Sequence, residues 1–379
     1  MATPKKVVIV GDGTAGIAAA NKLRFSTTLS ELEVTVVGNS SRHFYKADGV
    51  LIPFGYRNYR KSVRPTNFLL NYGIDYIKDD VIRIDVKQRS VFLRSGRSMV
   101  ADYLIIASGN RNAPEELPGY EGEAKHFFDL QHSLEIREYM KSFNGGQIVV
   151  GSSNRSDAYF PTLAEFSLLM KDYIKEHSLD GKSPVVFLTP NDENSFSKFA
   201  SLLSPIMEKC GIEVHKKAEI TSVDSKNKEV VLSDGQKVKY NLLVASPPMR
   251  GRGLISDISA VDEYGYAKVD PKNLTVGGYD DTYAIGDAQR NTIFRSAVSA
   301  HRQAMFVSSR IVADCVSGLS EPEYRDSTHG IIITGKDKAA SYDGNASGDI
   351  SMGPESPGNF LIRNYSADTY FSSILRGMI

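Results

Sequence analysis

The chain has 379 residues, with 45 basic and 45 acidic side chains and therefore no formal net charge. This length is typical of two or three domains, and the balanced charge excludes the basic surface expected of a nucleic-acid-binding protein. The sequence contains no apolar run of about 18 residues, the length that a membrane-spanning helix needs. Its two cysteines, Cys210 and Cys315, lie far apart and offer neither a C-x-x-C pair nor a metal-ligand spacing. We therefore expect no nucleic-acid partner and no metal.

A glycine-rich turn near the N-terminus is the most informative segment. A β-branched run at 7–10 predicts a buried strand, and the pattern G-x-G-x-x-G at 11–16 then opens a helix predicted over 17–23. With the strand expected at 33–37 this is a βαβ unit of about 30 residues. It predicts dinucleotide binding by Gly11, Gly13, Thr14, Ala15 and Gly16. Because the first strand starts so early, we expect no signal peptide and a cytoplasmic location.

The end of the second strand departs from this fingerprint. Such a strand usually ends in Asp or Glu, which binds the ribose hydroxyls, but here Gly38, Asn39 and Ser40 follow it. Asn39 and Ser40 can still hydrogen-bond a ribose, so we expect the site to be kept. The missing carboxylate argues against simple NAD binding at this position.

The middle of the chain repeats the plan of the first unit. In both halves a βαβ core is followed by a β-meander or hairpin and by an apolar strand that ends in small residues, at 103–107 and again at 241–245. A linker with two prolines at 110–123 joins the halves. The remaining strands are expected at 80–85, 90–94, 147–150, 184–189, 212–215 and within the hairpin 218–239, and the helices at 129–142, 161–177 and 196–210.

The last third contains an Ile-Gly-Asp motif at 285–287, followed by a helix predicted over 295–317. The tail from Thr328 is predicted to form strands at 330–334 and 359–364 and to end in a short helix. That helix carries an i, i+3, i+4, i+7 apolar stripe, formed by Phe371, Ile374, Leu375 and Met378. Such a stripe either packs on its own domain or docks on a membrane surface.

Two dinucleotide-type units, a strand ending in Ala107-Ser108-Gly109 and the Gly286-Asp287 pair together resemble the two-domain FAD/NAD(P) flavoprotein reductases. The resemblance implies an α/β fold with two Rossmann-like domains: an FAD-binding domain at 1–113 and 245–327, and an inserted NAD(P)-like domain at 114–244. Residues 328–379 would form a C-terminal interface or membrane-surface segment. It also implies bound FAD, with Asp287 on the ribityl chain. Its cofactor-binding residues would be the five of the glycine turn with Gly38, Asn39, Ser40, Lys46, Val81, Ala107, Ser108, Gly109, Gly286 and Asp287.

Within that group the chain resembles the sulfide:quinone oxidoreductases. The segments 159–161 and 164–166 match the family's pattern after the second unit's first strand, and 43–46 resembles its aromatic stretch beside the flavin. The second unit has no further glycine motif, because Ser152, Ser153, Asn154 and Arg155 follow Gly151. The resemblance implies a quinone acceptor and is compatible with a homodimer and with peripheral attachment to the inner face of a membrane.

The redox cysteines of that family are missing. Ungapped matching places them at Phe128, Tyr159 and Gly330, and no side chain there can replace a thiolate nucleophile. We therefore expect an FAD-dependent oxidoreductase that passes electrons from an unidentified donor to a quinone or similar acceptor, without ordinary sulfide oxidation. The alternatives are a type II NADH dehydrogenase or NAD(P)H-dependent electron-carrier reductase, and a flavin-binding protein without catalysis.

Three side chains are candidates for catalysis. Glu165 matches a family glutamate near the flavin and quinone, and its apolar neighbours suggest a carboxyl suited to proton transfer. His132 matches a family histidine, although a surface helix histidine explains it equally well. Tyr159 either gates substrate or fills the space of a lost cysteine.

Overall fold

A mainly parallel sheet forms the centre of the first unit. The computed structural model describes residues 3–153, 160–189, 195–315 and 323–378, and within them this sheet has the strand order β19-β20-β9-β1-β2-β5. Only the β19–β20 pairing is antiparallel. The strands are β1 (Lys5–Val10), β2 (Leu32–Gly38), β5 (Ile74–Lys78), β9 (Tyr103–Ile106), β19 (Thr275–Val276) and β20 (Tyr279–Ala284).

Both faces of this sheet are covered. Helices α1 (Thr14–Ser26) and α5 (Ala297–Cys315) pack against one face and against each other, and a small antiparallel sheet covers the other. That sheet consists of β6 (Val81–Asp85), β7 (Ser90–Leu93) and β8 (Ser98–Val100). Every residue of the β9 strand is buried, as expected of a parallel strand that is packed on both faces.

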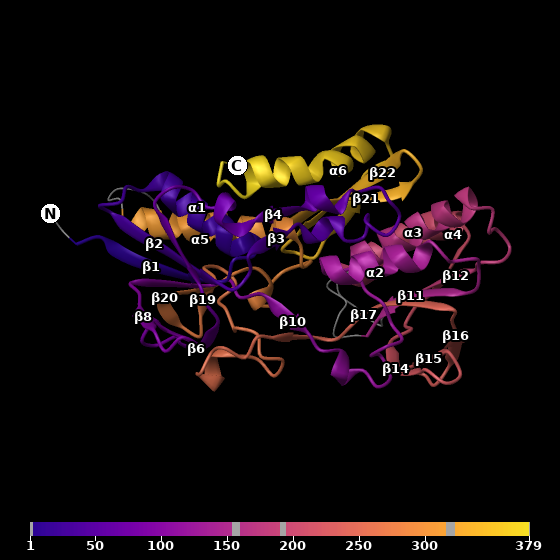
Figure 1. Ribbon diagram of the computed structural model, residues 1–379, viewed down its shortest axis with the longest axis horizontal. Coiled ribbons are helices and arrows are strands. Elements are labelled where there is room, and N and C mark those ends of the chain that lie inside the picture. The colour runs from indigo at the N-terminus through magenta and orange to yellow at the C-terminus, as the bar shows by residue number, and fades with distance from the viewer. Residues whose placement is uncertain (1–2, 154–159, 190–194, 316–322, 379) are drawn as a thin grey trace.

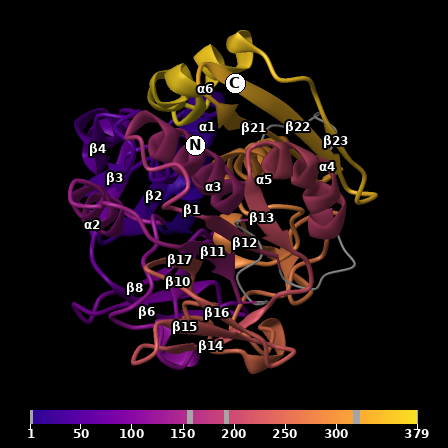
Figure 2. The same cartoon turned by 90° about the vertical axis from the view of Figure 1, so that its right-hand side faces the viewer.

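The second unit has its own parallel sheet, of order β13-β12-β11-β17. Its helices line one face and a meander lines the other (Figures 1 and 2). The strands are β11 (Ile148–Ser152), β12 (Val185–Leu188), β13 (Ile212–His215) and β17 (Leu242–Ser246); the helices are α2 (Leu130–Met140), α3 (Phe160–Glu176) and α4 (Ser195–Lys209); the meander is β14 (Ile220–Asp224), β15 (Glu229–Leu232) and β16 (Lys237–Lys239).

Two antiparallel crossing strands connect the units. The chain leaves the first unit along β10 (Asn110–Asn112) and returns along β18 (Met249–Gly251), and these two strands pair with each other. The first sheet therefore takes strands from both sides of an inserted segment. The domain limits expected at 113/114 and 244/245 stay predictions.

The C-terminal segment forms a sheet and a helix. The strands are β21 (Ser327–Gly335), β22 (Lys338–Asn345) and β23 (Ile350–Met352), and α6 (Pro357–Thr369) with the π-helical turn Tyr370–Ile374 follows. Strand β21 packs against α3 and α5, β22 against α6, and β23 against α4. Figure 1 shows α6, in yellow, lying across the top of the molecule. Within the described ranges, no helix combines the length and apolar character needed to cross a membrane.

The strand predicted at 359–364 is wrong, because these residues belong to α6. The helix has strong start signals that the prediction missed: Ser356 is the N-cap and accepts a hydrogen bond from the Asn359 amide at 3.1 Å, and Pro357 occupies the first turn. The apolar stripe after α6 packs inward, with Phe371 and Leu375 buried in the core of the first unit and Met378 exposed.

Candidate active site

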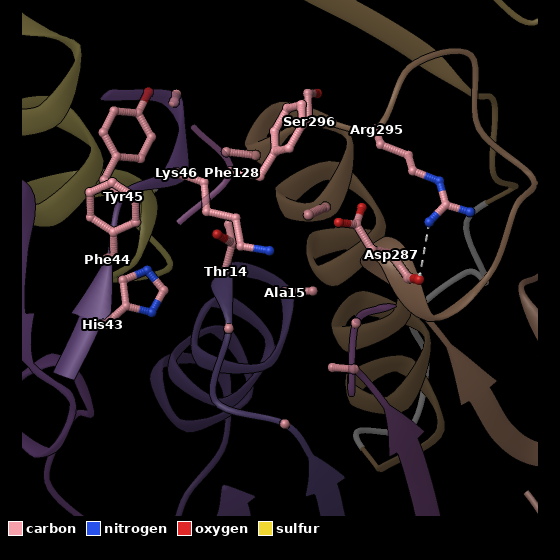
Figure 3. Close-up of a pocket in the computed structure, with 18 of the residues that line it drawn as sticks. Thr14, Ala15, His43, Phe44, Tyr45, Lys46, Phe128, Asp287, Arg295 and Ser296 are labelled. Carbon is pink, nitrogen blue, oxygen red and sulfur yellow. Dashed lines mark hydrogen bonds between the residues drawn. The ribbon is translucent and has the colours of Figure 1, made fainter. Parts of the chain in front are cut away.

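A cavity of about 770 Å³ runs along the carboxyl ends of the first sheet. Ligand sites of α/β sheets lie at this edge, and the volume is ordinary for a cofactor pocket. The cavity reaches from the β5–β6 connection, past the glycine turn, to the C-terminal segment. Figure 3 shows its central part, around Thr14, Lys46 and Asp287. Its lining includes residues 10–15, 37–40, 42–47, 79–81, 107–110, 127–130, 285–287, 295–298, 329–332 and 362–363, with Glu165, Tyr342, Ser366, Thr369 and Ile374.

The glycine turn has the shape of a phosphate cradle. Gly11 has φ +117°, and a Cβ on it would lie 2.2 Å from the carbonyl oxygen of Ala107. A Cβ on Gly16 would meet the Gly11 carbonyl oxygen at 1.9 Å, whereas one on Gly13 would meet nothing within 4 Å. Gly13 caps α1 without a side-chain hydrogen bond, and no acidic residue lies in the first turn. The helix therefore presents free N–H groups and its positive dipole end to the cavity.

The Gly286-Asp287 motif lies directly beside this turn. Gly286 has φ +63°, and a Cβ on it would be 3.1 Å from the Cβ of Ala15, so a side chain there would push the two segments apart. Its amide donates to Oε1 of Gln303 on α5 at 2.7 Å. Figure 3 shows the Asp287 side chain at the cavity beside Ala15, with the Arg295 guanidinium donating to the Asp287 backbone oxygen at 3.5 Å.

Asp12, the second residue of the glycine turn, places a carboxylate at the end of β2. A Cβ on Gly38 would lie 2.3 Å from the Asp12 Cγ, so only glycine leaves room for this side chain. Oδ2 of Asp12 accepts from the Ser40 amide at 3.0 Å and from the Tyr76 hydroxyl at 2.8 Å. The carboxylate that β2 lacks in sequence is therefore supplied from the neighbouring turn.

A buried hydrogen-bonded chain joins the glycine turn to the C-terminal segment. Nδ1 of His43 lies 3.2 Å from the Asp12 carbonyl, which can only accept, so Nδ1 carries the proton. Nε2 then accepts from the Tyr370 hydroxyl at 2.6 Å, and Tyr370 in turn accepts from Thr14 Oγ1 at 2.6 Å. Tyr45 stacks on Tyr370 with the ring centres 4.2 Å apart. Burial lowers the pKa of His43 from 6.5 to about 4, so its ring is neutral near pH 7.

Glu165 is held in a buried ion-pair network. Arg363 of α6 donates from Nε and Nη2 to the two carboxylate oxygens, each at 3.1 Å, and the Ile333 amide donates to Oε1 at 3.1 Å. Burial by itself would lower the pKa of Arg363, but the Glu165 carboxylate outweighs it and the pKa is raised. The expected apolar surroundings are therefore incomplete, because a permanent cation faces the carboxylate.

A second carboxylate extends this network. Asp48 is completely buried and pairs with Arg57 at 3.2 Å, while Arg363 lies 3.9 Å away. The Ser62 hydroxyl donates to Asp48 at 2.7 Å. Burial raises the pKa of Asp48, although Ser62 and the two guanidiniums act in the opposite direction. Two carboxylates and two guanidiniums thus balance their charges inside the protein.

Aromatic rings stand near two of the positions matched to redox cysteines. Phe128 is buried and lines the cavity. A Cβ on Gly330 would lie 2.2 Å from the ring of Tyr342, so no thiol fits there without moving that buried ring. Neither Cys210 nor Cys315 lines the cavity. Tyr159, matched to the remaining cysteine, lies outside the described residues, as do Asn154 and Arg155.

The comparison with protein families identifies the chain. The family described as pyridine nucleotide-disulphide oxidoreductase matches residues 5–304, which include both parallel sheets. The chain belongs to this family. Its α/β fold with two Rossmann-type units agrees with that assignment, and the protein is an FAD-dependent oxidoreductase.

The chain is also similar to individual known proteins. The mitochondrial sulfide:quinone oxidoreductase of Mus musculus is 23% identical over 311 residues, covering 79% of this chain and 69% of that protein. The type II NADH:quinone oxidoreductase of Staphylococcus aureus is 24% identical over 305 residues, covering 75% and 74%. The structure of the sulfide:quinone oxidoreductase from Aquifex aeolicus matches with a TM-score of 0.87 at 18% identity and covers 98% of this chain and 92% of that one.

The residues predicted from sequence for the FAD site largely converge on the cavity. Glu165 lines it, together with Gly11, Gly13, Thr14, Ala15, Gly38, Asn39, Ser40, Lys46, Val81, Ala107, Ser108, Gly109, Gly286 and Asp287. Gly16 is absent from the lining and packs α1 against the turn. His132 lies on α2 outside the lining, where its ring pairs with Asp129, and a catalytic role for it stays a prediction. Asp12, Arg363 and Tyr370 were missed.

Proposed function

We propose that the protein transfers electrons from a small donor through FAD to a quinone. Ile362 of α6 is the observation that carries this proposal, because this apolar side chain lines the cavity and is also 60% exposed to solvent. An apolar, lipid-soluble acceptor thus has an apolar route between the outside and the cofactor cavity. Relatives named as sulfide:quinone and NADH:quinone oxidoreductases support the same acceptor class.

The adenosine half of FAD would lie at the glycine turn and the end of β2. We assign the pyrophosphate to the free N–H groups at the start of α1, and the ribose hydroxyls to Asp12, in place of the carboxylate that usually ends β2. Asp287, beside Ala15, would accept hydrogen bonds from the ribityl chain. Bound FAD supplies the two-electron chemistry, and these residues hold and orient it.

Glu165 is the proposed proton-handling group on the acceptor side. It lines the cavity, belongs to α3 and is fixed by Arg363 of α6, the same helix that exposes Ile362. Reduction of a quinone to a quinol consumes two protons, and a titratable side chain at a buried site can deliver them. Arg363 would hold the Glu165 side chain in a fixed orientation beside the cavity.

The outer face of α6 is the proposed contact with a membrane surface. Leu361, Ile362 and Tyr365 are 55%, 60% and 64% exposed, and they lie within two turns of the helix. An amphipathic helix that lies on a lipid surface buries such a face in the headgroup region. The quinone route would then open toward the lipid that dissolves the quinone.

The donor is proposed to act without a cysteine relay. Phe128 and the Gly330–Tyr342 contact occupy two positions where a thiol would be needed. NADH is the alternative donor, since one relative is an NADH:quinone oxidoreductase. Against it, strand β11 ends in the buried Ser152 and is followed by the buried Ser153 instead of glycines, and a nicotinamide pyrophosphate needs close backbone approach.

Anaerobic titration of the FAD-loaded protein tests donor and acceptor separately. NADH, NADPH and sulfide are added in turn while the flavin absorbance is followed, and rapid bleaching by NADH would make the alternative donor correct. The protein is then reduced chemically and mixed with a short-chain quinone. We expect fast reoxidation, slowed by about 10²-fold in Glu165→Gln, whereas ferricyanide, which takes up no protons, should reoxidise both proteins equally. Failure of any quinone to reoxidise the flavin would refute the proposed acceptor and favour a flavin-binding protein without this activity.

A further inference from the structure

Three potential metal ligands meet at the start of α2. His126, Asp129 and His132 each offer one ligand atom, and these atoms lie within 4.8 Å of one another. Asp129 is the N-cap of α2, and its side chain accepts from the His132 amide at 2.9 Å. The capping contact also brings the His132 ring to the carboxylate, with Nδ1 2.7 Å from Oδ2.

The second imidazole distinguishes this cluster from an ordinary capped helix. The His126 ring centre lies 3.9 Å from that of His132, at an interplanar angle of 31°. His126 is only 6% exposed and stacks on Phe128 with the ring centres 5.7 Å apart. Capping requires neither the buried imidazole nor its approach to His132, because Asp129 alone satisfies the free amide of the helix.

We propose that His126, Asp129 and His132 bind one divalent transition-metal ion, with Zn²⁺ as the reference ion. Two imidazoles and a carboxylate are a common ligand set for such ions. Tetrahedral metal–ligand bonds of about 2.0–2.2 Å place the ligand atoms roughly 3.3–3.6 Å apart. The His126 nitrogen would therefore move toward the other two ligands, while His132 Nδ1 and Asp129 Oδ2, now 2.7 Å apart, would separate slightly. This movement is available to His126, because its contact with the Phe128 amide, at 3.4 Å, is longer than a good hydrogen bond.

Asp129 can keep its structural role when the metal binds. Oδ1 would continue to cap the His132 amide, and Oδ2 would exchange the His132 ring for the ion. Phe128 covers His126 and lines the cofactor cavity together with Asp129 and Leu130. The bound ion would therefore fix the segment 126–132, which forms part of the cavity wall, and three protein ligands leave a coordination position for water or an exogenous ligand.

The test uses the untagged, FAD-loaded protein after removal of metals with a chelator. We expect equilibrium dialysis against 10 µM Zn²⁺, read by elemental analysis, to give one ion per chain, and Co²⁺ to give a visible absorption band that Zn²⁺ abolishes. His126→Asn and His132→Gln should each lower the affinity by about 10-fold or more. His329→Ala is the matched control, because His329 also pairs with a carboxylate, Asp343 at 2.8 Å.

Flavin content and circular dichroism monitor the fold of each variant. The proposal would be overturned if both ligand variants still bound one ion per chain. It would also be overturned if His329→Ala lowered the metal affinity as much as the ligand variants do. If a ligand variant loses its flavin, the unmodified protein decides the test. If it shows no Co²⁺ absorption band and binds no zinc at 10 µM Zn²⁺, the proposal is overturned as well. These measurements do not use the reoxidation of the flavin by quinone. The metal proposal is therefore tested independently of the proposed function.

Discussion

Replacing Arg363 with Met should destabilise the protein through the carboxylate that it leaves behind. Met matches the length of the aliphatic part of the side chain but removes both hydrogen bonds to Glu165 and the bond from Nη2 to the Ala47 carbonyl at 2.7 Å. Glu165 would then keep only the Ile333 amide as a partner. A buried charge that loses its partner is strongly unfavourable.

The expected loss is about 3–5 kcal/mol, the range for breaking a buried ion pair. An unfolding entropy of about 2.1 cal/mol/K per residue amounts to roughly 0.8 kcal/mol/K for 379 residues. The melting temperature should therefore fall by roughly 4–6 °C. Arg325→Met is the matched control, because Arg325 pairs with Glu323 on the surface at 3.5 Å with 85% of its side chain exposed, and such pairs contribute at most about 1 kcal/mol.

Flavin fluorescence released on heating provides the assay, with circular dichroism as an independent measure of unfolding. The double variant Arg363→Met/Glu165→Gln removes the orphaned charge and should recover most of the lost stability. A fall of less than 1 °C in Arg363→Met, or a double variant no more stable than the single one, would refute the view that a buried charge imbalance determines the result.

Three further predictions concern the cofactor cavity and its support. Asp287→Ala should weaken FAD binding by about 10- to 100-fold, since a charged hydrogen bond contributes roughly 1.5–3 kcal/mol; unchanged affinity in a fluorescence titration would remove the ribityl role. Asp12→Ala should weaken FAD by a similar factor but leave FMN, which lacks the adenosine ribose, almost unaffected, and equal losses for both flavins would contradict the ribose assignment. His43, with a folded pKa of about 4 against 6.5, should make unfolding easier as pH falls from 6.5 to 4, because only the unfolded chain takes up the proton there. The free energy of unfolding should fall by about 3 kcal/mol over this range. Urea unfolding at several pH values should show that the free energy of unfolding of His43→Gln depends less steeply on pH than that of the unmodified protein.

The local parts of the site could be predicted from sequence because each depends on neighbouring residues. The turn at Gly11, Gly13 and Gly16 could be predicted because the strand before it, the spacing of its glycines and the start of the next helix all lie within one short segment. The Gly286-Asp287 motif was likewise expected at the cofactor, and it lines the same cavity.

The parts that sequence reasoning missed depend on contacts between distant segments. Glu165 and Arg363 are separated by 198 positions, and nothing near Glu165 in the sequence announces a cation. The role of Asp12 could have been suspected from two local signals, an acidic residue inside the glycine turn and a glycine at position 38, but their meeting requires the register of β1 with β2. The proposed metal ligands were not predicted, because cysteine spacing gives no sign of His126, Asp129 and His132, which are spaced at regular intervals of three.

The hydrogen bonds that join Thr14, Tyr370 and His43 have a consequence for when the protein can bind its cofactor during synthesis. Thr14 is synthesised before its hydroxyl partner Tyr370, which follows 356 residues later. At about 5–20 residues per second, this interval lasts on the order of half a minute. The nascent first unit thus has its glycine turn long before Tyr370, and its second group of strands, β19 and β20, also arrives late. Tight flavin binding is therefore expected to begin only after Tyr370 has been synthesised, long after the glycine turn that binds the cofactor.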